Sequence, residues 1–267
     1  MTSNRTQLAR ALLVGCLAFV TAYARATERH FTDATADHKW STANNWNPSG
    51  VPTDGDHAVI DSNKLCNVDI LNARADSFEV VTTARLVILG SGALEMDSNS
   101  SIADAGGVQL NQGAELLISG SLTLSGNGSL RGLRTTATIK FTGNYDLANT
   151  STIEGAMIIQ HQSTGRFRLI NDGLVHANAD EGQSQSDRTL LLTEGTFRGS
   201  GEYKVSHDSR CKLEFAGGVI DTGLAADFTV EAGTLAINED ITTTGHLTFT
   251  GGTIVVDDND AFTAGSP

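Results

Sequence analysis

The sequence predicts an all-β protein, a single-domain, right-handed parallel β-helix (a β-solenoid) with almost no helix. Short runs alternate apolar and polar residues with a period of two, which is typical of half-buried strands. Glycine turns separate the runs, and units of about 20 residues recur without a sustained 3.6-residue helical period. Proline, which would remove a donor from a strand ladder, is absent from residues 53–266. The right-handed sense is taken from β-helices in general rather than from these residues.

The repeat is clearest at residues 247–256, where a pair of glycines separates two alternating runs. We expect its four apolar side chains to face a shared interior: Leu247, Phe249, Ile254 and Val256. On that interpretation Phe249→Asp would cost at least about 3 kcal/mol, because it would bury an unpaired charge. An apolar residue also lies three positions before each of several turn glycines, which predicts that they share one corner of the stack: Gly92, Gly113, Gly173, Gly195, Gly218, Gly233 and Gly252.

Two features separate the stacked fold from its alternative, a β-sandwich or a pair of sandwiches. A sandwich favours hairpins with tight Asn-Gly or Asp-Gly turns, whereas the recurring turn here is longer. The cysteines Cys66 and Cys211 would lie about seven coils apart, some 30 Å at about 4.8 Å per coil. A disulfide needs Cα atoms within about 7 Å, so the stacked fold predicts two unpaired thiols.

The N-terminus has the pattern of a secretory signal peptide spanning residues 1–26. Arg5 and Arg10 provide a basic region, residues 11–20 an apolar stretch, and residues 24–26 an A-x-A cleavage site. An alternative is a lipoprotein signal ending at Cys16, although the apolar run before that cysteine is short. Either reading predicts a secreted protein, extracellular or at the cell surface. No segment approaches the roughly 20 apolar residues of a membrane span.

Charge restricts the partners. The chain carries 18 Lys and Arg against 31 Asp and Glu, and removal of the signal peptide takes three arginines and no acid. The remaining chain therefore has 15 basic and 31 acidic residues, a net charge of −16. This acidity excludes nucleic acid as a partner and leaves extracellular polysaccharide or other surface proteins.

The stretch from Trp40 to Asp61 resembles the opening of secreted bacterial β-helix proteins, including autotransporter-like passenger domains, and the related opening of G8-type domains. The resemblance rests on Trp46, residues 50–52 (Gly-Val-Pro) and residues 55–56 (Gly-Asp), followed by the apolar pairs at 59–60 and 68–70. It covers about 50 residues well and the rest only through the repeat. It implies the architecture, with the Trp and Val-Pro stretch leading into the first coil, and implies little about function.

The same stretch is the expected structural cap of the solenoid. Trp40 and Trp46 are expected to cover the open interior of the first coil, with Pro52, Gly55 and Asp56 shaping the turns. The alternative role for the two tryptophans is an exposed platform on which sugar rings stack.

No catalytic, cofactor-binding or metal-binding residue is assigned from the sequence. Two sets could in principle assemble from neighbouring coils, His161 with Arg166 and Arg168, and His176 with Asp172 and Asp180, but nothing marks them out. The acidic run at 257–260 lacks the spacing of a calcium loop and predicts a solvated turn.

We therefore expect four parts: the signal peptide (1–26), an N-terminal cap (27–56), a solenoid of about nine coils (57–256) and an acidic tail (257–267) that is compatible with a longer native chain. The predicted function is a secreted, non-catalytic β-solenoid scaffold, such as a stalk, matrix component or adhesin-like protein. The alternative is a polysaccharide-binding or polysaccharide-degrading β-helix of the lyase or glycosidase type.

Overall fold

The computed structural model describes residues 26–102, 106–179, 188–220 and 224–265. Residues 1–25 of the predicted signal peptide, with the alternative lipoprotein cysteine Cys16, and the candidate Asp180 lie outside these residues. The described chain is nearly all β, with a single 3-10 turn, η1 (Ala43–Asn45). No helix within these ranges is long and apolar enough to cross a membrane.

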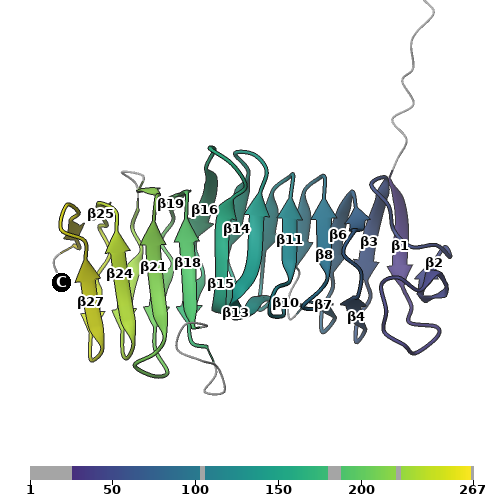
Figure 1. The fold of residues 1–267 in the computed structure, drawn as a ribbon, viewed down its shortest axis with the longest axis horizontal. Helices are drawn as coiled ribbons and strands as arrows, with labels where there is room; N and C mark the ends of the chain where they lie inside the picture. Colours follow the sequence, from purple (N-terminus) through teal and green to yellow (C-terminus); the bar gives the residue numbers. More distant parts are fainter. Residues whose placement is uncertain (1–25, 103–105, 180–187, 221–223, 266–267) are drawn as a thin grey trace, which may run out of the picture.

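The strands form three parallel ladders, and successive strands of the chain pass from one ladder to the next. Coils stack along the long axis of the molecule from β1, in purple, to β27, in yellow (Figure 1). Every strand pair is parallel except β1 with β2, which is antiparallel. The predicted parallel β-solenoid of about nine coils is therefore confirmed.

The first face is the ten-stranded sheet β1 (Thr27–Phe31), β2 (Trp46–Asn47), β3 (Asp56–Ile60), β6 (Ser77–Val80), β9 (Ser100–Ile102), β12 (Leu122–Leu124), β14 (Asp146–Asn149), β16 (Phe167–Asn171), β19 (Gly195–Arg198) and β22 (Val219–Ile220). At the C-terminal end β25 (Ile241–Thr242) and β28 (Phe262–Thr263) form a separate parallel pair. The paired strands thus extend past both expected limits of the solenoid, residues 57 and 256.

The second face contains β4 (Leu65–Val68), β7 (Arg85–Ile88), β10 (Gly107–Leu110), β17 (Leu174–Ala177), β20 (Glu202–Val205), β23 (Asp227–Val230) and β26 (Leu247–Phe249). The third contains β5 (Ala73–Ala75), β8 (Ala93–Met96), β11 (Glu115–Ile118), β18 (Thr189–Thr193), β21 (Lys212–Ala216), β24 (Thr234–Asn238) and β27 (Thr253–Val256). Two long strands, β13 (Ser129–Phe141) and β15 (Thr152–His161), run through the corner between these faces. They join the second and third faces into one sixteen-stranded sheet.

The interior is filled by side chains that pack against one another within and between neighbouring coils. Phe141 of β13 stacks on Phe167 of β16 at 5.1 Å between ring centroids, and Phe167 meets Phe197 of β19 edge-on at 6.3 Å. The amides of Asn149 and Asn171 are buried and hydrogen-bonded to each other at 2.8 Å. Each buried large apolar side chain stabilises the stack by about 1.5–3 kcal/mol, so a coil depends on its neighbours.

The expectation that the turn glycines share one corner is wrong for three of the seven. Four of them lie between the second and third faces: Gly92, Gly113, Gly233 and Gly252. Three of these have a positive φ, and a Cβ on Gly252 would lie 2.6 Å from the carbonyl oxygen of Gly233 one coil below. Gly173 lies at the next corner, while Gly195 and Gly218 begin the approach to the first face beside the Phe197 ring. Glycine relieves close contacts at more than one corner of the coil, so the spacing of an apolar residue before a glycine does not tell one corner from another.

The last coil corrects a second expectation. Phe249 is 53% exposed, Leu247 36% and Val256 37%, and Ile254 is only partly buried. The corresponding side chains of the preceding coil are buried, because β26 and β27 stack on them. Within residues 224–265 no second- or third-face strand lies beyond β26 and β27. The expected burial of Phe249 is therefore wrong, and an Asp at this position would remain in contact with water.

The two cysteines lie in the interior. Cys66 is in β4 and Cys211 immediately precedes β21, and both are buried and unpaired. This confirms the prediction of two free thiols. Burial raises the pKa of both thiols, which opposes ionisation and reaction.

Candidate functional site

The N-terminal end of the stack is closed by three aromatic rings. Trp40 and Trp46 pack edge to face at 4.8 Å, and Phe31 packs against Trp46 at 5.1 Å. The indole NH of Trp46 donates to the carbonyl of Trp40 at 2.9 Å, and the backbone NH of Trp40 donates to the carbonyl of Asn67 in β4 at 2.8 Å. The exposed fractions of Trp40 and Trp46 are 0% and 2%, so neither ring offers a face to a sugar.

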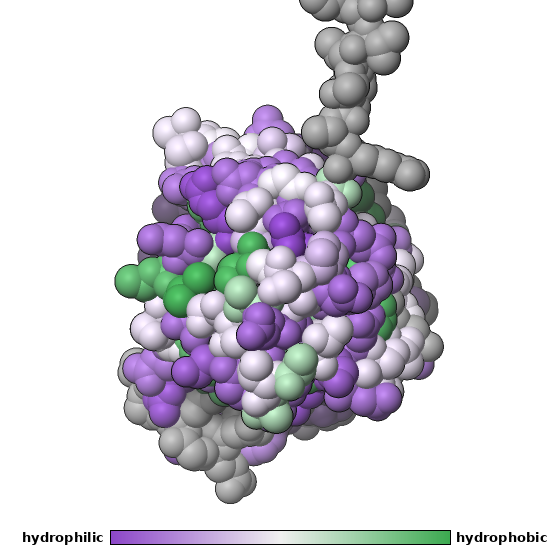
Figure 2. All heavy atoms as spheres, turned by 90° about the vertical axis from the view of Figure 1, so that its right-hand side faces the viewer, coloured by the Kyte–Doolittle hydropathy of each residue, from purple (hydrophilic) through white to green (hydrophobic). Residues whose placement is uncertain are grey.

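The turn at residues 52–56 ties this cluster to the first face. The Asp56 carboxylate accepts hydrogen bonds from the NH and hydroxyl of Thr53, both at 2.9 Å, and pairs with Arg29 at 2.9 Å. Burial raises the pKa of Asp56, but the bonds from Arg29 and Thr53 outweigh burial and leave that pKa below its ordinary value. The carbonyl of Gly55 accepts the NH of Thr27, and Pro52 is buried. Figure 2, which faces this end, shows a largely hydrophilic surface with small apolar patches.

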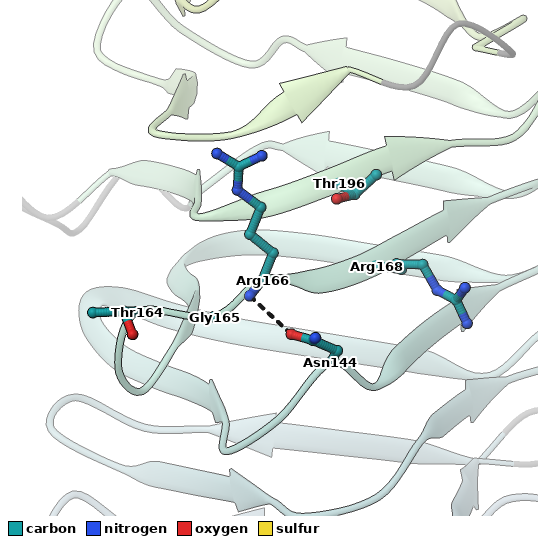
Figure 3. A pocket seen from close by; sticks show the side chains of 6 residues that line it. All are labelled: Asn144, Thr164, Gly165, Arg166, Arg168 and Thr196. Carbon is teal, nitrogen blue, oxygen red and sulfur yellow. Dashed lines mark hydrogen bonds between the residues drawn. The ribbon is translucent and has the colours of Figure 1, made fainter.

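A hollow of about 630 Å³ lies on the first face where the coils of β14, β16 and β19 meet (Figure 3). Its lining is polar and basic: Asn144, Thr164, Gly165, Arg166, Arg168 and Thr196. We call it the arginine hollow. Two of its lining residues, Arg166 and Arg168, are candidates from the sequence, so the candidate sets are compared with it below.

A tight turn places Arg166 at the hollow. The ring nitrogen Nδ1 of His161 accepts hydrogen bonds from the backbone NH groups of Ser163 and Gly165, both at 3.1 Å. A Cβ on Gly165 would lie 2.4 Å from Nε2 of the same ring, so only glycine can cover the imidazole so closely. The NH of Arg166 then donates to Oδ1 of Asn144 at 3.2 Å.

The two arginines have different electrostatic surroundings. Arg168 forms a two-pronged ion pair with Asp146, with Nε–Oδ1 at 2.5 Å and Nη2–Oδ2 at 2.7 Å. This hydrogen bonding raises the pKa of the Arg168 guanidinium. Arg166 forms no ion pair within the described part of the chain, and its side chain is exposed. Figure 3 shows the two side chains extending in different directions from the start of β16.

The structure brings His161, Arg166 and Arg168 to one turn, but it does not form a catalytic set from them. His161 is buried, with its Nδ1 occupied by two backbone donors. Its Nε2 has no hydrogen-bond partner among the described residues and is inaccessible to solvent. A base that must reach a bound substrate needs an accessible nitrogen, which His161 lacks.

The second candidate set, by contrast, is dispersed. Asp172 accepts hydrogen bonds from the NH and hydroxyl of Ser200, at 2.9 and 3.0 Å. His176 contacts the Ser206 hydroxyl at 2.6 Å instead. Burial, followed by the nearby Lys204 ammonium, lowers the pKa of His176. Glycoside hydrolysis needs two carboxylates flanking the bond. The described residues that line the arginine hollow include no Asp or Glu, and the nearby Asp146 is held in the ion pair with Arg168.

The acidic run after β27 folds into a turn of its own. The Asp257 carboxylate accepts the NH of Asp258 at 2.7 Å, and its carbonyl accepts the NH of Asp260 at 3.0 Å. Across the described ranges, no group of three or more His, Cys, Asp or Glu side chains is arranged to hold a metal ion.

The sequence singles out Arg166 and Arg168 but not Asn144, Thr164 or Thr196, which complete the hollow. Asn144 and Arg166 are 22 residues apart, as are Asp146 and Arg168. One coil therefore separates each interacting pair, and a search for polar residues at that local spacing could find them. The number of residues per coil varies along the chain, so no single spacing identifies such pairs in the sequence.

Residues 31–145 match the family model of a domain of unknown function (DUF8693). The match begins at the last residue of β1 and ends just before β14, so it contains Trp40 and Trp46 and the coils up to β13. Neither the curated proteins nor the solved structures include a match to this chain. The N-terminal cap and the early coils are thus what this chain shares with that domain family model.

Proposed function

We propose that this protein is a secreted, non-catalytic β-solenoid scaffold that acts outside the cell or at its surface, as a stalk, matrix component or adhesin-like rod. The observation that carries the proposal is the pairing of outward charges between adjacent coils. Such pairs recur along the second and third faces as well as the first: Arg74 with Glu95, Lys140 with Glu115, Arg168 with Asp146, and Lys204 with Glu231.

In these pairs each charged side chain binds a partner on the adjacent coil, and so helps to hold the two coils together. An exposed pair contributes at most about 1 kcal/mol, but repetition along an in-register stack favours one alignment of the coils. Backbone hydrogen bonds also run along the axis, and each coil extends the rod by about 4.8 Å. A rod of this kind suits spacing and attachment, whereas an enzyme needs reactive groups converging in one cleft.

The first test is an activity assay on the secreted chain. It would be incubated with a panel of neutral and acidic extracellular polysaccharides, while new reducing ends and the ultraviolet absorbance of unsaturated products are followed. We expect no product. Product formation by the wild type that disappears in Arg168→Ala would contradict a non-catalytic role and support the degrading β-helix instead.

A second test removes one complete coil from the stack. Ser129 and Thr152 are register partners, so deletion of residues 129–151 removes one complete coil and joins equivalent positions. We expect this variant to fold cooperatively, to be shorter by about 4.8 Å and to remain on the surface of intact producing cells in antibody labelling. Retention inside the cell of both the variant and the wild type would refute the extracellular role.

A further inference from the structure

We propose that the arginine hollow binds the carboxylate group of a sparsely charged saccharide. This goes beyond a purely structural role, because it gives the scaffold a ligand. The central group is Arg166, whose exposed guanidinium is unpaired within the described residues. An arginine guanidinium binds a carboxylate with two parallel hydrogen bonds.

The rest of the lining matches the hydroxyl groups of a sugar. Thr164 and Thr196 supply hydroxyls, and Asn144 supplies a side-chain amide whose oxygen is already turned towards the backbone NH of Arg166. Hydroxyl and amide groups both donate and accept hydrogen bonds, as sugar hydroxyls do. A volume of about 630 Å³ is within the range of small-ligand sites, whereas an inorganic anion would occupy only a small part of it.

The charge of the whole protein limits the ligand further. With a net charge of −16 after removal of the signal peptide, the protein repels densely charged anionic polymers at long range. The local attraction of one or two guanidinium groups is enough for an isolated carboxylate. The favoured ligand is therefore a mainly neutral saccharide that carries a single uronic acid residue.

Asp146 competes with this ligand for Arg168. Its carboxylate holds both Nε and Nη2 of that guanidinium. Replacement by Asn keeps the shape of the side chain and removes the negative charge, which frees Arg168 for the ligand. The proposal therefore predicts a gain of affinity in Asp146→Asn as well as a loss in Arg166→Ala.

The test uses the mature chain and a matched pair of disaccharides in titration calorimetry. Cellobiouronic acid carries one carboxylate, and cellobiose is its neutral counterpart. We expect the acid to bind at least about 10-fold more tightly than cellobiose, and Arg166→Ala to remove that preference. Asp146→Asn should strengthen binding of the acid several-fold.

Arg85→Ala is the matched control, because Arg85 is also exposed, lies in β7 on the second face and contacts Gln109. It makes the same change in net charge and should alter the affinity less than about 2-fold. Equal losses in Arg85→Ala and Arg166→Ala would overturn the site, as would the absence of any preference for the acid. Inorganic sulfate binding as tightly as cellobiouronic acid would reduce the hollow to a simple anion site and overturn the saccharide assignment.

Discussion

The two ends of the described solenoid differ in what covers the apolar side chains of the outermost coil. At the N-terminal end Trp40 and Trp46 lie across the first coil and are buried, whereas at the C-terminal end Phe249 is 53% exposed. The alternating apolar pattern of the interior coils continues into the C-terminal end, whereas the segment that carries the two tryptophans is rich in turns. The difference shows that, in a stack of parallel coils, an inward side chain is buried only when a coil or a cap lies beyond it.

The strand register allows the exposed fractions of two equivalent side chains to be compared directly. Val230 in β23 and Phe249 in β26 are partners in the same ladder, one coil apart. Val230 is completely buried because β26 lies over it, while nothing in the described residues covers Phe249. Position along the axis, rather than the local pattern, sets the contribution of each side chain to stability.

The largest effect that we expect comes from placing a charge at these two partners. Val230→Asp should lower the free energy of unfolding by about 3–5 kcal/mol, because it buries a carboxylate without a partner. Phe249→Asp should cost less than about 1 kcal/mol, because the carboxylate remains in water. Denaturant unfolding of both variants measures the difference, and equal costs would show that the last coil is covered.

The next effect separates the capped end from the open one. Trp40→Ala should cost about 3 kcal/mol, since it opens a cavity over the first coil and removes the contact with Trp46. Phe249→Ala is the matched truncation of an aromatic side chain at the open end, and it should cost under about 1 kcal/mol. A cost for Trp40→Ala as small as that for Phe249→Ala would remove the tryptophans from the role of a cap.

The alternation of apolar residues predicted the strands, and together with the repeat of about 20 residues it predicted parallel stacking and two unpaired cysteines. It was insufficient for the register of the turns, because Gly173, Gly195 and Gly252 relieve similar close contacts at three different places in the coil. It also failed for Phe249, whose exposure depends on what lies beyond the last coil. The arginine hollow combines Asn144 with Arg166 across one coil of 22 residues, and the variable coil length conceals such a pair until the local spacing is known.

A smaller effect concerns the reactivity of the buried thiols. Cys66 lies in β4, whose edge is bonded to Trp40 through Asn67, whereas Cys211 lies several coils away. In the native protein both thiols should react slowly with a thiol reagent, because burial keeps them protonated and inaccessible. Trp40→Ala should accelerate labelling of Cys66 about 10-fold or more while Cys211 changes little, since opening at one end is local. Peptide mapping after brief alkylation distinguishes the two sites, and equal acceleration would indicate global unfolding instead.

The smallest effect is a dependence of stability on pH at the capped end. His30 in β1 bonds to Asp61 through Nδ1 at 2.9 Å and to Glu28 through Nε2 at 2.6 Å. The hydrogen bond to Asp61 is the main reason that the pKa of His30 is raised in the folded protein. The protonated ring therefore stabilises the fold fully below the unfolded pKa of about 6.5, and this contribution is lost as the pH rises through the higher folded-state pKa.

Melting temperatures of the wild type and His30→Gln should therefore differ most in mildly acidic solution and converge as the pH rises above neutrality. Asp61→Asn removes the main partner of His30, so in that background His30→Gln should have a smaller effect at low pH. A difference between wild type and His30→Gln that grows with pH would contradict the proposed ion pairs. Because β1 begins the first-face ladder, such a result would mean that the capped end owes its stability to the aromatic cluster rather than to charge at its edge.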